Sequence, residues 1–409
     1  MFLTCEQQQN TAWGKGAASF RGILIIFALT ACAASSAFAG DAERLQAKRI
    51  HDRLTGVPPT PAVLTAMEAE ITGPGGAVDA AILAIDPARN PRAFNFYNTT
   101  LKNFATPWTN EAQSVFDPLN DYTATVIGMI RDDVPFNTLL SADTVYVGDS
   151  SISGVSAYSP SDNTHYENLE DLSVDLSDTS NLFPVSQSVQ NSIPVAGVAG
   201  IMTTRAAAQA FFIDGTNRAM FRFTMLNHLC NDLEQVKDTT RSADRVRQDV
   251  SRSPGGDSRL FLNACVGCHS GMDPMAQAFA YHNYDESQGR MVYTPGQVQP
   301  KYLINADNFE YGYITPDDRW DNYWRSGQNA VLGWSSGLPG NGKGAASLGQ
   351  ELANSTAFAG CQVRKAYRTV CLNEPSQAQM VALRDVLTNQ TNYNMKQVFA
   401  EAAAQCAGN

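Results

Sequence analysis

The 409-residue chain has few of the residues from which metal sites and polar active sites are built, with five histidines and eight cysteines. It contains no paired-carboxylate pattern, no Ser-His-Asp arrangement, no glycine-rich phosphate loop and no internal repeat. An acidic run between residues 148 and 193 lacks the Asp-x-Asp-x-Asp-Gly order of a calcium loop, so a solvated connection explains it better. These absences leave no sequence support for a hydrolase, a nucleotide-binding protein or a calcium-binding protein.

Long apolar runs are also scarce. The run at residues 22–30 (GILIIFALT) follows the basic residues Lys15 and Arg21 and is too short to span a bilayer. With the Ala-Phe-Ala sequence at its end, the segment 1–39 is predicted to be a signal peptide. A second interpretation takes LTAC, which ends at Cys32, as a lipobox that would tether the protein to a membrane by a lipid anchor. Both indicate export to the periplasm, and we prefer the soluble form. No other segment is predicted to cross a membrane.

Charge limits the partners. Loss of the signal peptide removes two basic residues and one acidic residue, so the net charge changes from -11 to -12. An acidic surface argues against nucleic acid and anionic membranes. It would suit a basic redox partner protein, although solubility alone also explains it.

One motif carries the functional hypothesis: residues 265–269 read CVGCH. C-x-x-C-H is the attachment site of a c-type haem, because two cysteines three residues apart meet the two vinyl groups on one edge of the porphyrin and the next imidazole reaches the iron. A thioredoxin-like pair expects a preceding hydrophobic strand, and a zinc site expects a second ligand pair; the sequence offers neither. The motif predicts one covalent haem c per chain, attached at Cys265 and Cys268, with His269 as the proximal iron ligand.

The sixth iron ligand decides the function. A methionine or histidine closes the iron for electron transfer, whereas an open face permits chemistry with small ligands. Met291 and then His282 are the preferred candidates, because both follow a short helix predicted at 274–281. Met272 lies too close to His269 to reach the other face and is expected to pack. Three further donors precede the motif and are expected to be core or surface residues rather than ligands: Met202, Met225 and His228.

Charged residues near the motif have simpler interpretations. Asp273 is expected to cap the helix that begins at Pro274 rather than to contact the iron. Arg290, Arg319 and Arg325 could pair with haem propionates, but exposed salt bridges explain them equally well.

The four remaining cysteines of the mature chain predict two disulfides, as expected in an oxidising compartment. A helix predicted from 355 to 371 would separate Cys361 and Cys371 by about 15 Å, and a disulfide tolerates about 7 Å between Cα atoms. Two more helices follow, and an up-down-up arrangement brings Cys371 and Cys406 to the same end. We therefore predict the pairs Cys371–Cys406 and Cys230–Cys361.

Helical periodicity with start and stop signals predicts a mainly α, multi-helical fold with few short strands. Clear helices are predicted at 61–71 and 121–131, and the best strand candidate lies at 144–147. The predicted units, in chain order, are a signal peptide 1–39, an N-terminal helical domain 40–150, a polar acidic connection 151–195, a cytochrome-c-like haem-binding module 196–340 and a C-terminal three-helix domain 341–409.

The residues around the motif resemble a known family. Residues 263–275 (NACVGCHSGMDPM) and 283–285 (NYD) are similar to the C-x-x-C-H-x-x-M-D-P … F/Y-D block of the large, mostly uncharacterised cytochrome-c-like families first noticed in planctomycetes. Shorter stretches at 53–60, 197–204 and 357–361 look like the flanking parts of the same group. The resemblance implies periplasmic haem binding with an electron-transfer role, and it supplies no substrate.

These observations support one main hypothesis, an exported mono-haem c-type cytochrome that transfers single electrons between periplasmic redox partners. One alternative is a haem enzyme or ligand sensor with an open sixth position. The lack of a second haem motif weakens the enzyme interpretation, because bacterial di-haem peroxidases use two. Another alternative is a scaffold protein in which the haem is structural.

Overall fold

The computed structural model describes residues 40–107 and 117–408. This part of the chain is mainly helical, with 54% helix, and its named strands form three separate two-stranded antiparallel sheets. The predicted mainly α fold class is confirmed. The predicted signal peptide and Cys32 lie outside the described residues.

The N-terminal helices begin where the sequence supplies caps. The hydroxyl of Thr60 accepts the backbone N–H of Val63, and a proline occupies the first position of the helix that follows. Asn120 caps a second helix by accepting two backbone N–H groups of its first turn. After a helical stretch at 40–55, the elements are α2 (Pro61–Thr72), α3 (Gly76–Ile85), the π-helical turn η1 (Phe96–Thr100), α4 (Leu101–Ala105) and α5 (Asp121–Arg131).

The segment 151–195 is more than the solvated connection predicted from its composition. Its strand pairs with the strand before it, so that Val145 lies opposite Val185. Tyr166 is buried and donates its hydroxyl to the backbone carbonyl of Tyr146. Many of the acidic residues instead form local turns at the surface, as where Ser180 donates to Asp178. The elements are β1 (Val145–Gly148), α6 (Thr164–Asp171), β2 (Leu182–Val185) and α7 (Gln187–Gln190).

The segment that contains the motif combines helices with long irregular stretches. The charged composition of the stretch 237–257 predicts a partly helical, exposed segment, but its helical structure is limited to one short 3-10 turn at Pro254–Gly256. The elements of the whole motif-containing segment are α8 (Arg205–Phe211), α9 (Arg218–Leu229), α10 (Leu233–Val236), α11 (Ser258–Leu260), the π-helical turn η5 (Phe261–Cys265), α12 (Val266–Ala276), β3 (His282–Asp285), β4 (Arg290–Tyr293) and β5 (Arg319–Asp321).

The C-terminal helices are held by the two predicted disulfides. Cys230, at the end of α9, bonds to Cys361 with a Cα–Cα distance of 5.2 Å. Cys371 bonds to Cys406 with a Cα–Cα distance of 5.9 Å. Both predicted pairings are therefore confirmed. The elements are β6 (Asn341–Lys343), α13 (Gly344–Ala353), α14 (Thr356–Cys371), α15 (Gln377–Asp385), the π-helical turn η10 (Val386–Gln390) and α16 (Met395–Ala407).

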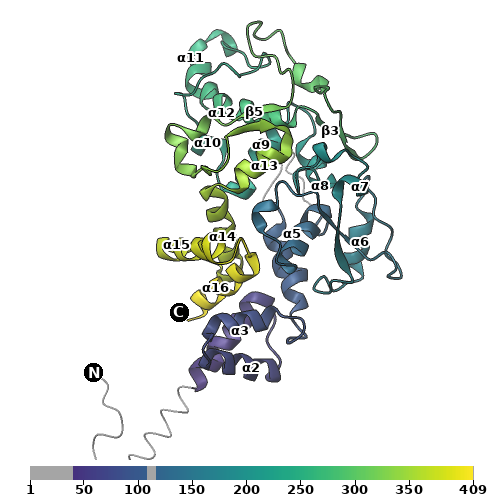
Figure 1. Ribbon diagram of the computed structural model, residues 1–409, viewed down its shortest axis with the longest axis vertical. Coiled ribbons are helices and arrows are strands. Elements are labelled where there is room, and N and C mark those ends of the chain that lie inside the picture. The colour runs from purple at the N-terminus through teal and green to yellow at the C-terminus, as the bar shows by residue number, and fades with distance from the viewer. Residues whose placement is uncertain (1–39, 108–116, 409) are drawn as a thin grey trace, which may run out of the picture.

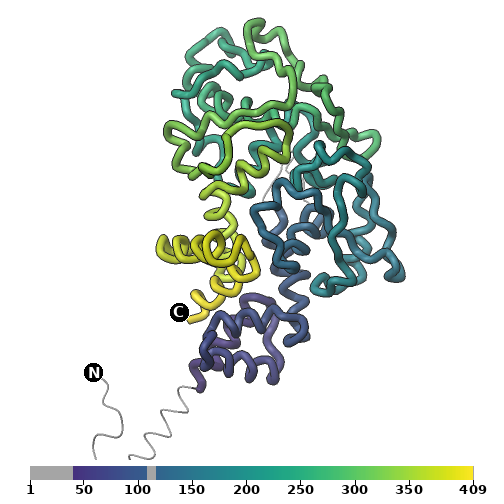
Figure 2. The backbone as a smooth tube through the Cα atoms, viewed as in Figure 1, coloured from purple at the N-terminus to yellow at the C-terminus, as the bar shows by residue number. Residues whose placement is uncertain are grey.

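The molecule is elongated, with α2 and α3 at one end and α11 and α12 at the other (Figure 1). The C-terminal helices return from the α12 end to lie beside the N-terminal ones, where α16 packs on α3 (Figure 2). One hydrophobic cluster contains residues of all four predicted mature units, so the predicted boundaries do not separate independent cores. Within the described residues, no helix combines the length and apolarity needed to cross a membrane.

Candidate functional site

Helix α12 presents the motif on one face. It begins at Val266, directly after η5, whose π-type turn is closed by the bond from the N–H of Val266 to the carbonyl of Phe261. Positions i, i+3 and i+4 share a helix face, so Cys265, Cys268 and His269 lie together. All three side chains are partly exposed, while the residues between the two cysteines are buried.

The opposite side of α12 is tightly packed. The carbonyl of Gly267 accepts the N–H of Asp238 at 2.8 Å. One turn later, Gly271 lies so close to the indole of Trp324 that a Cβ there would be 2.0 Å from Nε1. Met272 is buried in the main hydrophobic cluster, which agrees with its predicted packing role. The helix is therefore fixed from behind, and the outward face that carries the motif is held in place.

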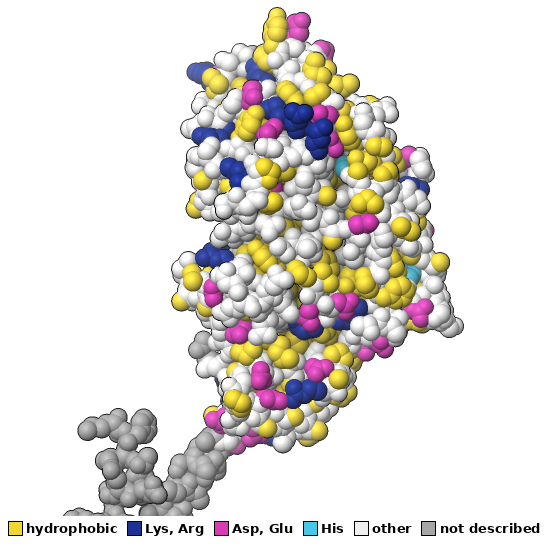
Figure 3. Space-filling view, viewed as in Figure 1, with side chains coloured by type: hydrophobic (Ala, Val, Ile, Leu, Met, Phe, Trp, Pro, Cys, Tyr) yellow, Lys and Arg dark blue, Asp and Glu magenta, His cyan; other side chains and the backbone are white. Residues whose placement is uncertain are grey.

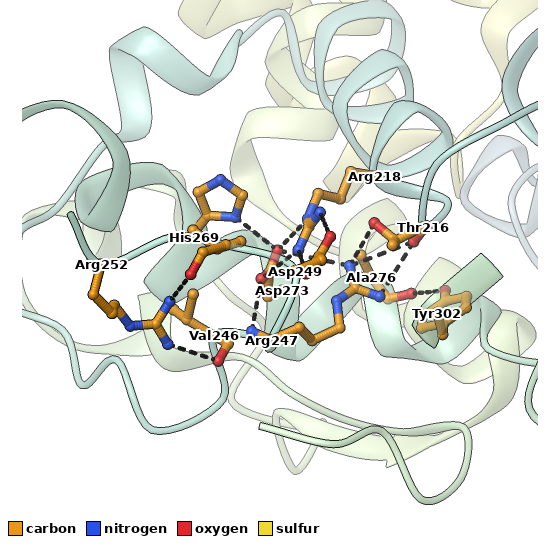
Figure 4. A network of polar contacts seen from close by, with 11 residues as sticks. Thr216, Arg218, Val246, Arg247, Asp249, Arg252, His269, Asp273, Ala276 and Tyr302 are labelled. Carbon is orange, nitrogen blue, oxygen red and sulfur yellow. Dashed lines mark hydrogen bonds and ion pairs between the residues drawn. The ribbon is translucent and has the colours of Figure 1, made fainter. Parts of the chain in front are cut away.

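The imidazole of His269 is held by one of its two nitrogens. Nδ1 lies 3.1 Å from Oδ1 of Asp273, one helical turn further on (Figure 4). An ionised carboxylate only accepts hydrogen bonds, so Nδ1 carries a proton, and in the neutral imidazole Nε2 then keeps its lone pair. Nε2 has no hydrogen-bond partner among the residues that the structure describes, and the side chain is 21% exposed. This is the tautomer that a histidine needs to bind a metal through Nε2.

Asp273 is ionised because of its neighbours. Burial alone would raise the pKa of this fully buried carboxyl, but the guanidinium groups of Arg218 and Arg247, together with His269, hold the pKa well below its ordinary value. Arg218 donates to both carboxylate oxygens, at 2.7 Å and 2.9 Å. The same guanidinium also makes two hydrogen bonds to Asp249, at 2.6 Å and 2.9 Å. The buried charge is thus compensated on more than one side.

The prediction that Asp273 caps a helix is wrong. α12 continues through Pro274 to Ala276, followed by a 3-10 turn at Gln277–Phe279, so no helix begins at this point. A proline inside a helix removes one backbone hydrogen bond, and a helix packed as closely as α12 can tolerate that loss. The i, i+4 spacing from His269 to Asp273 was the available signal, and it becomes visible only when the helix is continued through the proline.

The candidate sixth ligands lie on the β3–β4 hairpin. His282 is fully buried, its Nε2 lies 3.0 Å from the carbonyl oxygen of Gly197, and its ring stacks on Phe212 with centroids 5.4 Å apart. Burial lowers the pKa of His282 to about 4. Met291 is buried opposite Tyr284 and belongs to the main hydrophobic cluster. His282 could therefore use Nε2 as a ligand only by giving up its bond to the backbone.

The two motif cysteines differ from the other four described ones, because they are not disulfide-bonded. Burial raises the pKa of the Cys268 thiol, and the nearby Glu234 adds to the shift. Haem attachment requires only the two thiols and one axial imidazole from this helix, since the porphyrin supplies four nitrogens. The residues on the outward face of α12 fit that requirement. No group of three or more metal-binding side chains occurs within 40–107 and 117–408.

The three candidate propionate partners have different surroundings. Arg325 forms a two-bond ion pair with the buried Glu351, at 2.8 Å and 2.7 Å. Arg290 donates to the carbonyl of Asn191 at 3.3 Å. Arg319 is exposed on β5. Of the two roles considered for these arginines, propionate partner or salt bridge, Arg325 therefore has the salt bridge.

Comparison with protein-family models, with curated proteins and with solved structures found no match. The functional assignment therefore rests on the residues and geometry of α12, and the family resemblance stays a prediction.

Proposed function

We propose that this chain is an exported mono-haem c-type cytochrome that transfers single electrons between periplasmic redox partners. The outward face at the start of α12 carries the proposal: Cys265, at the end of η5, and Cys268 form no disulfide there, and Nε2 of His269 has no partner among the described residues while Asp273 holds Nδ1. A bound haem would supply the one-electron chemistry. The protein would contribute two thioether attachments, one axial nitrogen of fixed orientation and a rigid helix behind them.

Haem attachment is tested by producing the full chain in a host that matures c-type cytochromes. We expect a coloured protein whose mass exceeds that of the mature polypeptide by one haem, and whose colour survives denaturation. Replacing Cys265 and Cys268 by serine should abolish the added mass. The matched control replaces Cys371 and Cys406, which removes the same number of cysteines and should leave the haem attached. A colourless wild-type protein with the bare polypeptide mass would disprove the proposal.

One observation supports the alternative of a haem enzyme or ligand sensor with an open sixth position. Nε2 of His282 is held by the carbonyl of Gly197, and Met291 is packed in the core. Visible spectra of the reduced holoprotein separate the two functions. A sharp low-spin band that carbon monoxide does not change supports an electron carrier, whereas a high-spin spectrum that shifts with carbon monoxide supports the alternative. If either residue is the ligand, Met291→Leu or His282→Gln will change the reduction potential.

The charge distribution indicates what kind of surface a partner meets. Residues 40–195 carry a formal net charge of -12, whereas 196–340 carry -2 and 341–409 carry +2. On the face shown in Figure 3, acidic side chains are scattered rather than gathered in one patch. A redox partner that docks on the α12 end therefore meets a nearly neutral segment. We expect its rate of electron transfer to depend only weakly on ionic strength.

A further inference from the structure

We infer that Asp273 is a positioning residue that makes His269 a strong axial donor and so lowers the reduction potential of the bound haem. The inference rests on the proposed function. It concerns the layer of residues behind the iron ligand, which the C-x-x-C-H motif does not specify.

The contacts of Asp273 support this role. Its side chain is fully buried, and Oδ1 accepts from Nδ1 of His269 at 3.1 Å and from Nε of Arg218 at 2.7 Å. Oδ2 accepts from the second nitrogen of Arg218 at 2.9 Å and from the backbone N–H of Arg247 at 3.4 Å. The guanidinium of Arg247 lies 3.7 Å from Oδ1. No other carboxylate contacts His269 among the residues that the structure describes.

The hydrogen bond determines how strongly the imidazole donates. When a metal-bound histidine gives its second N–H to a carboxylate, the ring is fixed in orientation and becomes more basic. A more basic ligand stabilises the oxidised iron more than the reduced iron, and the reduction potential falls. Arg218 opposes this effect because it draws charge away from Asp273, and Asp249 reduces that opposition by sharing Arg218. The four side chains in this hydrogen-bonded row, Asp249, Arg218, Asp273 and His269, together set how strongly the imidazole of His269 donates electrons to the iron.

The test compares Asp273→Asn with Asp249→Asn in the holoprotein. Both variants remove one negative charge from the same network, but only the first removes the carboxylate that His269 contacts. We expect Asp273→Asn to raise the one-electron reduction equilibrium constant about tenfold, which corresponds to about 59 mV. Asp249→Asn should shift it by clearly less. Equal shifts in the two variants would mean that charge alone acts through space, and the inference would be overturned.

A second readout follows the hydrogen bond itself. In the oxidised holoprotein, the proton NMR signal of the Nδ1–H of His269 should move in Asp273→Asn and stay close to its wild-type position in Asp249→Asn. An unmoved signal in Asp273→Asn would contradict the inference.

If Asp273→Asn does not fold, Arg218→Lys provides a variant of unchanged net charge. A lysine cannot make the two-bond contact of a guanidinium, so Asp273 would keep more of its charge for His269. The potential should then fall, and a rise or no change would overturn the inference. A protein that carries no haem at all would refute the proposed function instead, so the two failures are distinguishable.

Discussion

Replacing Gly271 by alanine tests whether α12 is held from behind as tightly as the structure shows. The added Cβ would lie 2.0 Å from Nε1 of Trp324 and 2.3 Å from its Cε2, whereas ordinary contact begins at 3.4 Å. The indole cannot easily move away, because Trp324 is fully buried and contacts Phe221, and Trp334 donates a hydrogen bond to its backbone carbonyl.

The magnitude follows from two opposing effects. Alanine is favoured over glycine inside a helix by about 1 kcal/mol. Overpacking of a close-packed interior costs about 1–3 kcal/mol, and the short distance at Gly271 places this site at the upper end. We therefore expect Gly271→Ala to lower the free energy of unfolding by about 2 kcal/mol.

Gly267→Ala is the matched control, four residues earlier on the same helix. Its Cβ would approach the Cβ of Lys237 to 3.3 Å, which a shift of a few tenths of an ångström relieves. The helix preference then dominates, and the variant should be as stable as the wild type or more stable by about 0.5 kcal/mol. Urea unfolding of both holoproteins, followed by far-ultraviolet circular dichroism, gives the comparison. If the two variants change the free energy of unfolding equally, Trp324 does not pack tightly against α12 at Gly271.

Two further predictions concern the rest of the fold. Cys230 and Cys361 are 131 residues apart, and loop entropy predicts that replacing both by serine lowers the free energy of unfolding by about 5 kcal/mol. Cys371 and Cys406 are only 35 residues apart, so the same replacement there should cost about 4 kcal/mol. Urea midpoints in the reverse order would contradict this. Burial lowers the pKa of His165 from 6.5, and its neutral ring donates to one backbone carbonyl and accepts from one backbone N–H. As the pH falls, His165 is therefore protonated in the unfolded chain before it is protonated in the folded one. Its contribution to the free energy of unfolding is complete above pH 6.5 and declines below that pH by up to about 1.4 kcal/mol per pH unit. His165→Gln should reduce that slope, and an unchanged slope would refute the assignment.

Features that depend on neighbouring residues could be predicted from the sequence. The helix at Asp121–Arg131 agrees with its predicted bounds, because apolar spacing and a local capping residue define it. The disulfide pairs could be predicted as well, since helix length excluded Cys361–Cys371 and the order of the last helices brought Cys371 and Cys406 together. The proposed haem-attachment motif could be recognised for the same reason, because its three residues lie within five positions.

Most buried contacts between polar groups that are distant in the sequence could not be predicted. Composition placed 151–195 in solvent, but Tyr166 and the β1–β2 pairing bury part of it against a strand that precedes it in the chain. The charged stretch 237–257 resembled an exposed helix, yet Arg247 is buried and donates to Thr216. In both segments, polar residues that suggest solvent are satisfied by groups far away in the sequence.

The candidate site divides in the same way. Cys265, Cys268 and His269 are sufficient to predict that a haem is bound, because attachment and ligation are local chemistry. Under the proposed function, the reduction potential of that haem would depend on Asp273, whose partner Arg218 comes from another helix, 55 residues earlier. A buried carboxylate is stable here only because those cations surround it, so the hydrogen bond that orients His269 requires the folded chain. Chains with the same pentapeptide can therefore bind the same cofactor and still differ in reduction potential.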